Sequence, residues 1–282
     1  GGMAAGRISS RMEENMRITT KTITTNYELC GPEQAPVAML SHSLASGMSM
    51  WDPQLTALQS RFRILRYDSR GHGGSDVPDG PYRLDDLVAD AVALMDALAI
   101  RQVHFVGLSM GGMIGQGIAL AHPDRLLSLS LCSTSAWIPP QAQPVVQERI
   151  DTALKEGLQA LVDGTLARWF TPGYLKTKPP EVERIRRQFL ATPVVGYVGC
   201  TEAIRRLDYL EQLARIKVPT LILVGEEDTL MATDNKVLQL IQGFDLTKPF
   251  STARLHHHMG KRLWEQSPHP EKSMVAAAAK FD

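Results

Sequence analysis

Short apolar segments alternate with longer amphipathic ones along the first half of the chain. Residues 36–40, 62–68, 101–106 and 127–132 have the length and composition of buried strands. Residues 54–59, 84–98 and 113–121 lie between them and repeat apolar positions at helical spacing. Residues 17–24 and 26–29 precede them and predict an edge hairpin. The alternation predicts an α/β fold whose central sheet is mostly parallel and flanked by helices.

The pattern changes after position 137, where strands give way to a series of helices. Residues 145–160, 161–170, 180–191 and 195–210 read as four helices with no strand between them, and strand character returns at 218–224. We therefore predict a helical cap, residues 138–212, inserted between the two parts of an α/β core, residues 16–137 and 213–282. A chain of 282 residues is long enough for such a core and insertion.

Ser109 lies between Gly107 and Gly111, where an apolar strand meets an apolar helix. This placement is typical of a nucleophile elbow, a strained turn that exposes a serine hydroxyl above a sheet. Glycine on both sides leaves room for a close crossing of strand and helix. The helix that follows directs N–H groups and the positive end of its dipole toward a group attacked by the serine. We therefore predict that Ser109 is a catalytic nucleophile.

A serine nucleophile needs a base to accept its proton and a carboxylate to orient that base. In folds with this elbow the chain order is serine, acid, histidine. The strand at 218–224 is followed by three carboxylates, of which Asp228 is the preferred acid because it lies furthest into the loop. The preferred base is His258, in a run of three histidines near the end of the chain. The alternatives are Glu226 and Glu227 for the acid, and His257 and His256 for the base.

Two backbone N–H groups are expected to bind the oxyanion that forms during attack. The first belongs to Met110, directly after the nucleophile, and the second to Leu44, in the loop after the strand at 36–40. We expect His42 and His72, which lie in small-residue loops, to make structural hydrogen bonds, and Asp68 and Arg70 to form a structural turn pair. Consecutive histidines rarely converge on one ion and no further ligand is suitably spaced, so we predict no metal.

Several motifs resemble those of the α/β-hydrolase superfamily and, within it, the 3-oxoadipate enol-lactonases of aromatic catabolism. They comprise residues 27–33, 40–46, 66–73 and 107–112 of the core and residues 168–172, 191–200 and 212–220 of the cap region. The resemblance implies a cytoplasmic hydrolase that uses no cofactor and opens the enol-lactone to 3-oxoadipate through an acyl-enzyme. It also implies a substrate pocket under the cap, for which the candidate residues are Ser43, Trp137, Arg168 and Trp169. Trp137 stands near a position where the family commonly carries a basic residue.

Composition restricts the partners that the chain could bind. Lys plus Arg and Asp plus Glu number 30 each, so no net field favours nucleic acid or an anionic membrane. No apolar run approaches the roughly 20 residues needed to span a bilayer, and three widely spaced cysteines suit a reducing compartment. We expect a small lactone or ester as the binding partner and make no prediction of oligomeric state. Two other functions fit the same pattern: a broad-specificity carboxylesterase or lactonase, and a ligand-binding protein without turnover.

Overall fold

The computed structural model describes residues 16–224 and Asp228. Its strands are β1 (Met16–Thr19), β2 (Thr24–Cys30), β3 (Val37–Ser41), β4 (Arg63–Tyr67), β5 (Val103–Leu108), β6 (Leu126–Cys132) and β7 (Thr220–Leu223). Within the described residues these strands form one seven-stranded sheet in the order β1-β2-β4-β3-β5-β6-β7. The five neighbouring strands β4, β3, β5, β6 and β7 run parallel, whereas β1 and β2 join the edge antiparallel. The predicted mostly parallel sheet with an edge hairpin is confirmed.

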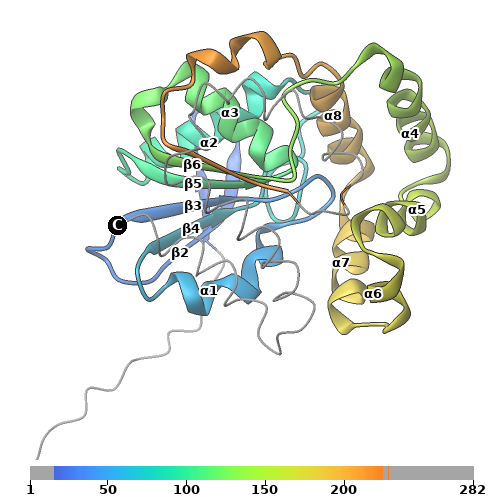
Figure 1. Ribbon diagram of the computed structural model, residues 1–282, viewed down its shortest axis with the longest axis horizontal. Helices are drawn as coiled ribbons and strands as arrows, with labels where there is room; N and C mark the ends of the chain where they lie inside the picture. The colour runs from blue at the N-terminus through green and yellow to red at the C-terminus, as the bar shows by residue number, and fades with distance from the viewer. Residues whose placement is uncertain (1–15, 225–227, 229–282) are drawn as a thin grey trace, which may run out of the picture.

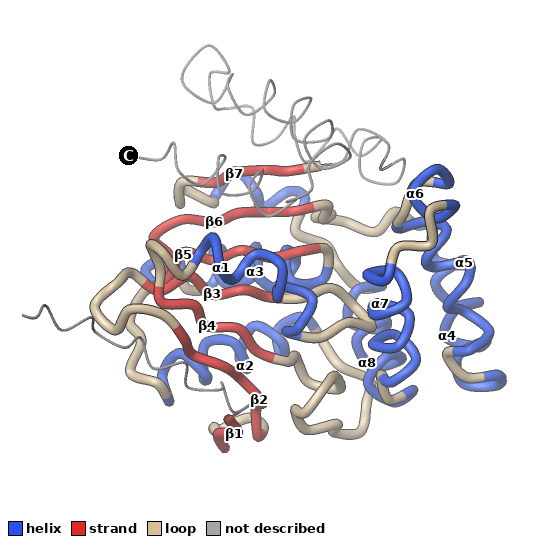
Figure 2. The backbone as a smooth tube through the Cα atoms, turned by 90° about the horizontal axis from the view of Figure 1, so that it is seen from below, coloured by secondary structure: helices blue, strands red, loops and turns tan. Residues whose placement is uncertain are grey.

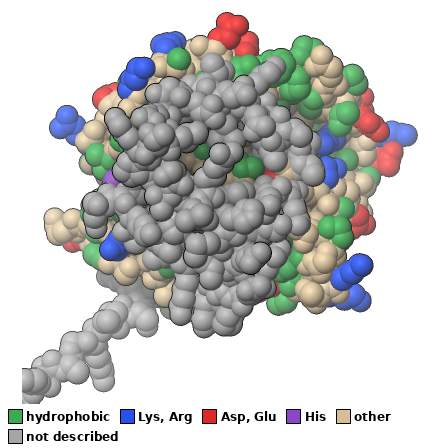
Figure 3. Space-filling model, viewed as in Figure 1, with side chains coloured by type: hydrophobic (Ala, Val, Ile, Leu, Met, Phe, Trp, Pro, Cys, Tyr) green, Lys and Arg blue, Asp and Glu red, His purple; other side chains and the backbone are tan. Residues whose placement is uncertain are grey.

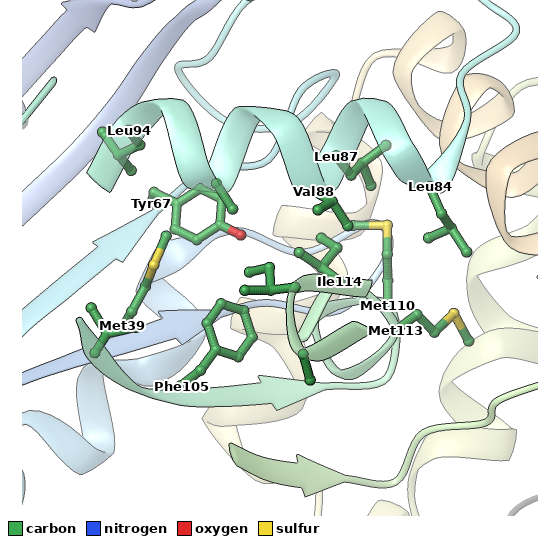
Figure 4. Packing of buried hydrophobic residues seen from close by; sticks show 14 of the residues in the cluster. Met39, Tyr67, Leu84, Leu87, Val88, Leu94, Phe105, Met110, Met113 and Ile114 are labelled. Atoms are coloured by element: carbon green, nitrogen blue, oxygen red, sulfur yellow. The ribbon is translucent and has the colours of Figure 1, made fainter. Parts of the chain in front are cut away.

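Helices cover both faces of this sheet. Figure 1 shows α2 (Leu84–Ala97) and α3 (Met110–Ala121) on one face and α1 (Asp52–Leu58) on the other. The larger apolar cluster lies between the sheet and the first pair, where Met39 and Phe105 of the strands meet Leu87 and Ile114 of the helices (Figure 4). Burial of aliphatic and aromatic side chains of this size stabilises a fold by ~1.5–3 kcal/mol each. The helix after the elbow begins at Met110, three residues earlier than predicted, because the turn leads directly into it.

The region after β6 is helical, as expected, but it is divided differently. It contains α4 (Gln143–Glu156), α5 (Gln159–Trp169), α6 (Pro172–Lys176), α7 (Pro180–Ala191) and α8 (Val194–Arg205). The sequence predicted four helices here; the described residues contain five, because Thr171 caps a short extra helix that starts at Pro172. Figure 2 shows α4 to α8 grouped at one end of the parallel strands. The division into a core and a cap with boundaries at 137 and 213 stays a prediction.

Around the rim of the view in Figure 3, both Lys and Arg and Asp and Glu side chains are present. This mixture agrees with the balanced composition of the whole chain, with formal net charge +0. Among the residues that the structure describes, no helix combines the length and the apolar character required to cross a bilayer. These residues therefore offer no spanning helix.

Candidate active site

The elbow, residues 107–111, connects the carboxyl end of β5 to the amino end of α3. Ser109 adopts φ 53° and ψ −113°, in the positive-φ range that side chains other than glycine rarely occupy. Such strain persists only where the surroundings enforce it, and it is common at catalytic positions. The residue remains partly accessible to solvent while Met110, next in the chain, is fully buried. The structure therefore gives the predicted nucleophile the conformation that its role requires.

Close packing of backbone on backbone enforces this turn. A Cβ atom on Gly107 would lie 2.3 Å from the carbonyl carbon of Gly111. A Cβ atom on Gly111 would lie 2.2 Å from the carbonyl oxygen of Ser41, at the end of β3. Both distances are far below van der Waals contact, and the obstructing atoms belong to the main chain, so neither position accommodates a side chain without a shift of the backbone. Glycine at both positions brings α3 against the carboxyl ends of β3 and β5.

Hydrogen bonds fix the backbone of the nucleophile on both sides. The N–H group of Ser109 donates to the carbonyl oxygen of Cys132 at 2.9 Å. Its own carbonyl oxygen accepts from the N–H group of Met113 at 3.1 Å and from the Oγ1 hydroxyl of Thr134 at 2.7 Å. Sequence analysis missed Thr134, although its place just after β6 indicates that it lies at the catalytic edge of a parallel sheet. The N–H groups of the first turn of α3, beginning at Met110, have no acceptor within the helix. The assignment of the Met110 N–H group to the oxyanion stays a prediction.

The loop after β3, residues 42–47, is the predicted second part of the oxyanion site and is referred to here as the oxyanion loop. Ala45 has φ 54°, and its N–H group donates to Nε2 of His72 at 2.9 Å. Ser43 is buried, and its hydroxyl donates to the carbonyl oxygen of Leu44 at 3.3 Å. Leu44 itself packs partly against both the core and the apolar cluster of the helical region. These contacts hold the loop in one shape; the assignment of the Leu44 N–H group to the oxyanion stays a prediction.

Two buried histidines support the loops instead of acting as bases, as the sequence predicted. Nε2 of His42 accepts from the N–H group of Ser69 at 2.9 Å, so its Nδ1 carries the proton and donates to the carbonyl oxygen of Ser43 at 2.7 Å. His72 accepts through Nε2, and its Nδ1 donates to the carbonyl oxygen of Arg70 at 3.1 Å. Burial lowers the pKa of His42, and burial followed by the neighbouring His42 lowers that of His72 to about 3. Both rings are neutral and have both nitrogens engaged.

Asp68 has the structural role expected from the sequence, but Arg70, its expected partner in the turn, pairs with Asp90 at 2.6 Å. The buried carboxylate of Asp68 accepts from Asn26 Nδ2 at 2.7 Å and from the N–H groups of Met48 at 2.8 Å and Gly74 at 2.9 Å. These donors come from β2, from the segment after the oxyanion loop and from the turn after β4. A single carboxylate thus connects three segments, which fixes the residues next to the oxyanion loop.

Of the remaining candidates for the triad, the structure describes only Asp228. Asp228 is partly buried, and its placement as the catalytic acid stays a prediction. Glu226 and Glu227, the alternative acids, and His256, His257 and His258, the candidate bases, lie outside the described residues. Within the described part no three His, Cys, Asp or Glu side chains gather in a way that could hold a metal ion. The prediction of a metal-free site stays a prediction because the histidine run is not covered.

The predicted pocket residues lie on separate elements. Trp137 follows β6 and forms an isolated antiparallel bridge with Asp208, which ties the two ends of the helical region together. Arg168 and Trp169 lie in the last turn of α5, where Trp169 is 41% exposed and meets the ring of Phe189 edge to face at 6.0 Å. Ser43, in the oxyanion loop, belongs to the sheet side of the site. Their common participation in a pocket stays a prediction.

A polar cavity of about 670 Å³ lies beside the oxyanion loop, between the ends of β2 and β4 and helix α7. None of Ser109, Met110, Leu44 or Asp228 lines it. Its charged groups already have partners: Arg66 pairs with Glu28 at 2.7 Å and with Asp52. We therefore do not assign substrate to this cavity.

Comparison with known proteins places this geometry in context. The family profile described as alpha/beta hydrolase fold matches residues 36–257. The chain is 36% identical over 211 residues to 3-oxoadipate enol-lactonase 2 of Acinetobacter baylyi, covering 75% of this chain and 78% of that protein. It is 30% identical over 214 residues, covering 73% of this chain and 80% of the relative, to a Stutzerimonas stutzeri protein with the provisional name carbamate hydrolase RutD.

Solved structures also include an α/β-hydrolase that is similar to this chain. The crystal structure of the enol-lactonase from Burkholderia xenovorans LB400 matches with a TM-score of 0.76 and 40% sequence identity. The match covers 80% of this chain and 87% of that one. The resemblance drawn from the elbow and cap motifs is thereby confirmed, as is the fold inferred from it.

Proposed function

Because the chain belongs to the α/β-hydrolase fold family, we propose that it is a serine hydrolase that opens a small carboxylated lactone, 3-oxoadipate enol-lactone, to 3-oxoadipate. The observation that carries this proposal is the conformation of Ser109: a positive φ at the end of β5, with glycine on both sides and an open first helical turn behind it. A serine with a purely structural role would not require this strained backbone.

The proposed reaction starts with attack by Ser109 Oγ on the lactone carbonyl carbon, while His258 accepts the hydroxyl proton. Asp228 orients the imidazole and stabilises its charged form. The N–H groups of Met110 and Leu44 bind the oxyanion. The ring C–O bond then breaks, and the enol oxygen that leaves takes the proton from His258. Water attacks the resulting ester on Ser109, gives its proton to His258 and releases the acid, after which the serine recovers its proton.

Relatives support the substrate class. Proteins named 3-oxoadipate enol-lactonase match three quarters of the chain, and the enol-lactonase structure from Burkholderia xenovorans has 40% identity with it. Their names also suggest a place in the β-ketoadipate pathway of aromatic catabolism. An enol is a good leaving group, so the demands on the protein fall on positioning the substrate and on hydrolysis of the acyl-enzyme.

The deciding experiment compares turnover of 3-oxoadipate enol-lactone with that of a neutral p-nitrophenyl ester and an aryl carbamate. The wild type and the Ser109→Ala, His256→Ala, His257→Ala and His258→Ala variants are assayed. We expect lactone turnover that is lost in Ser109→Ala and in His258→Ala alone among the histidine variants. Loss at His257 or His256 instead would move the base to that residue.

The other outcomes select the alternatives. Ester turnover without lactone turnover would indicate a broad-specificity carboxylesterase or lactonase, and preference for the carbamate would indicate the activity for which the Stutzerimonas stutzeri relative is named. Absence of turnover with all substrates, combined with a rise in melting temperature on adding the lactone, would indicate a binding protein, since a ligand that binds only the folded state stabilises it.

A further inference from the structure

The oxyanion loop and the elbow leave the sheet at adjacent positions. In the parallel pair of β3 and β5, Ser41 lies opposite Gly107. Leu44 follows Ser41 by three residues, and Ser109 follows Gly107 by two. Because parallel strands end at the same edge of a sheet, the two segments begin side by side. What the loop contributes to catalysis therefore depends on the direction in which its backbone N–H groups point.

The N–H group of Leu44 is the one of interest. Among residues 16–224 and Asp228, no oxygen or nitrogen accepts a hydrogen bond from it. Most backbone N–H groups with little access to water have a partner within the protein, and Leu44 is partly buried. An N–H group without a partner, in a loop beside the predicted nucleophile, suits a ligand atom that accepts a hydrogen bond.

The carbonyl group of Ser43 fixes the direction of this N–H group. Both belong to one trans peptide group, so the C=O and N–H bonds point in opposite directions. The carbonyl oxygen of Ser43 accepts from Nδ1 of His42 at 2.7 Å. Because the carbonyl is held against the His42 ring, the N–H group of Leu44 points away from that ring.

A third segment selects the tautomer of His42. The N–H group of Ser69, which follows β4, donates to Nε2 of the ring at 2.9 Å, so the proton of the neutral ring is on Nδ1. With the proton on Nε2, two N–H groups would face each other and the Ser43 carbonyl would lose its donor. The ring is fully buried, so water does not replace either bond. Ser69 thus supports the Ser43–Leu44 peptide group through His42.

His72 fixes the next peptide group. The N–H group of Ala45 donates to its Nε2 at 2.9 Å, and the Leu44 carbonyl of the same peptide group accepts from the Ser43 hydroxyl at 3.3 Å. The peptide groups on both sides of the Leu44 Cα atom are therefore held, one by each histidine. The two rings lie next to each other, with centroids 5.2 Å apart.

We propose that His42 and His72 are positioning residues for catalysis, which direct the Leu44 N–H group toward the oxyanion formed at Ser109. The proposal rests on the proposed function, because it concerns the oxyanion site of the same reaction. Each ring acts through one peptide group and does not touch substrate. Their roles are opposite: His42 has to donate through Nδ1, whereas His72 has to accept through Nε2. Filling of space alone would not depend on which nitrogen is engaged.

Asparagine and glutamine separate the two roles, because the amide of asparagine lies near the place of Nδ1 and that of glutamine near the place of Nε2. His42→Asn keeps a donor for the Ser43 carbonyl, and His42→Gln loses it. At His72 the order is reversed, since His72→Gln keeps an acceptor for the Ala45 N–H group and His72→Asn loses it. Every variant keeps one of the ring's two hydrogen bonds, so stability should fall by similar amounts within a pair.

Kinetics with p-nitrophenyl acetate measure the effect. We expect kcat to fall about 10²-fold in His42→Gln and His72→Asn, and less than about tenfold in His42→Asn and His72→Gln, with KM little changed in all four. The control is His104→Gln, near the start of β5, where the ring bonds the Ser128 hydroxyl away from the loop. It should leave kcat unchanged.

A trifluoromethyl ketone provides a second readout, because addition of a serine hydroxyl to its carbonyl leaves an oxyanion in a tetrahedral adduct. We expect its inhibition constant to rise in the variants in which kcat falls. General loss of stability would not produce opposite orders at the two positions, and thermal melts of all five variants check that they are folded.

Equal kcat within each pair, or the same order at both positions, would overturn the proposal. If one pair does not fold, the other decides, and failure of all four variants to fold would indicate a structural role alone. Turnover of the acetate ester without turnover of the enol-lactone would refute the lactone substrate and leave the histidine comparison valid. If wild type hydrolyses neither, affinity for the ketone decides: the crossed order supports the proposal, whereas equal affinity or no binding overturns it.

Discussion

The elbow and the helical region illustrate two different ways to build a site. At the elbow, backbone packs on backbone: the positions of Gly107 and Gly111 leave no room for a Cβ atom, and main-chain hydrogen bonds hold Ser109 in a strained conformation. In the helical region, side chains make the contacts, through the apolar cluster around Tyr197. A turn held by its backbone keeps the nucleophile in one conformation and accepts few substitutions. Side-chain contacts can be exchanged without loss of the fold, so we expect selectivity to reside there.

The largest effect on activity is expected at the predicted nucleophile, Ser109. Ser109→Ala removes the nucleophile but keeps a Cβ atom, so it should lower kcat by about 10⁴-fold or more and leave the fold unchanged. Steady-state kinetics and a thermal melt of the same sample provide the check. Residual activity within about tenfold of wild type would place the chemistry outside the elbow.

The backbone constraint predicts the next largest effect. Gly111→Ala places a methyl group 2.2 Å from the carbonyl oxygen of Ser41, and we expect a loss of about 3 kcal/mol or more in the free energy of unfolding. The matched control is Gly173→Ala in α6, where an added Cβ meets nothing within 4 Å and should be neutral or slightly stabilising. Urea denaturation measures both. Equal stability of the two variants would show that the crossing of α3 and β3 is not tight.

The neutral histidines make the core side of the site sensitive to acid. In the unfolded chain a histidine titrates near its ordinary pKa of about 6.5, whereas burial lowers the pKa of His42 and holds that of His72 at about 3. The unfolded state therefore binds more protons below pH ~6.5, and stability should fall as pH decreases from there toward 3. The slope should approach about 1.4 kcal/mol per pH unit for each histidine.

Urea denaturation between pH 8 and pH 5 tests this dependence. His72→Gln, which can still accept a hydrogen bond from the N–H group of Ala45, should flatten the slope. A variant with the wild-type slope would indicate that His72 is not the group responsible.

The smallest effect is expected at Thr134, just after β6. Thr134→Val removes the hydroxyl that donates to the Ser109 carbonyl and should cost about 1 kcal/mol of stability, with kcat lowered equally for acid and neutral esters. Urea denaturation and steady-state kinetics with a free-acid ester and its neutral methyl ester measure both effects. A change for the acid ester alone would place selectivity at the elbow and would remove the distinction between the two regions.

Local sequence patterns were sufficient to predict the sheet and the turn that carries Ser109. The alternation of strands and helices gave the parallel sheet, and Ser109 between two glycines was enough to locate the strained turn. Contacts between distant segments were harder to foresee. Thr134 and Asp68 act through hydrogen bonds to residues far away in the chain. The short helix α6 depends instead on a local cap, in which the Thr171 hydroxyl accepts from the N–H group of Tyr174. The junction of α4, α5 and α8 depends on how these helices pack on one another, which helical periodicity alone does not specify.

The central claim is that Ser109 is the nucleophile. Treatment with a fluorophosphonate, followed by proteolysis and mass spectrometry, tests it most directly, because the reagent bonds covalently only to an activated serine. The account predicts one adduct, on the peptide that contains Ser109, formed in step with the loss of esterase activity and slowed by the carboxylated lactone. An adduct on another serine, or loss of activity with Ser109 unlabelled, would contradict it.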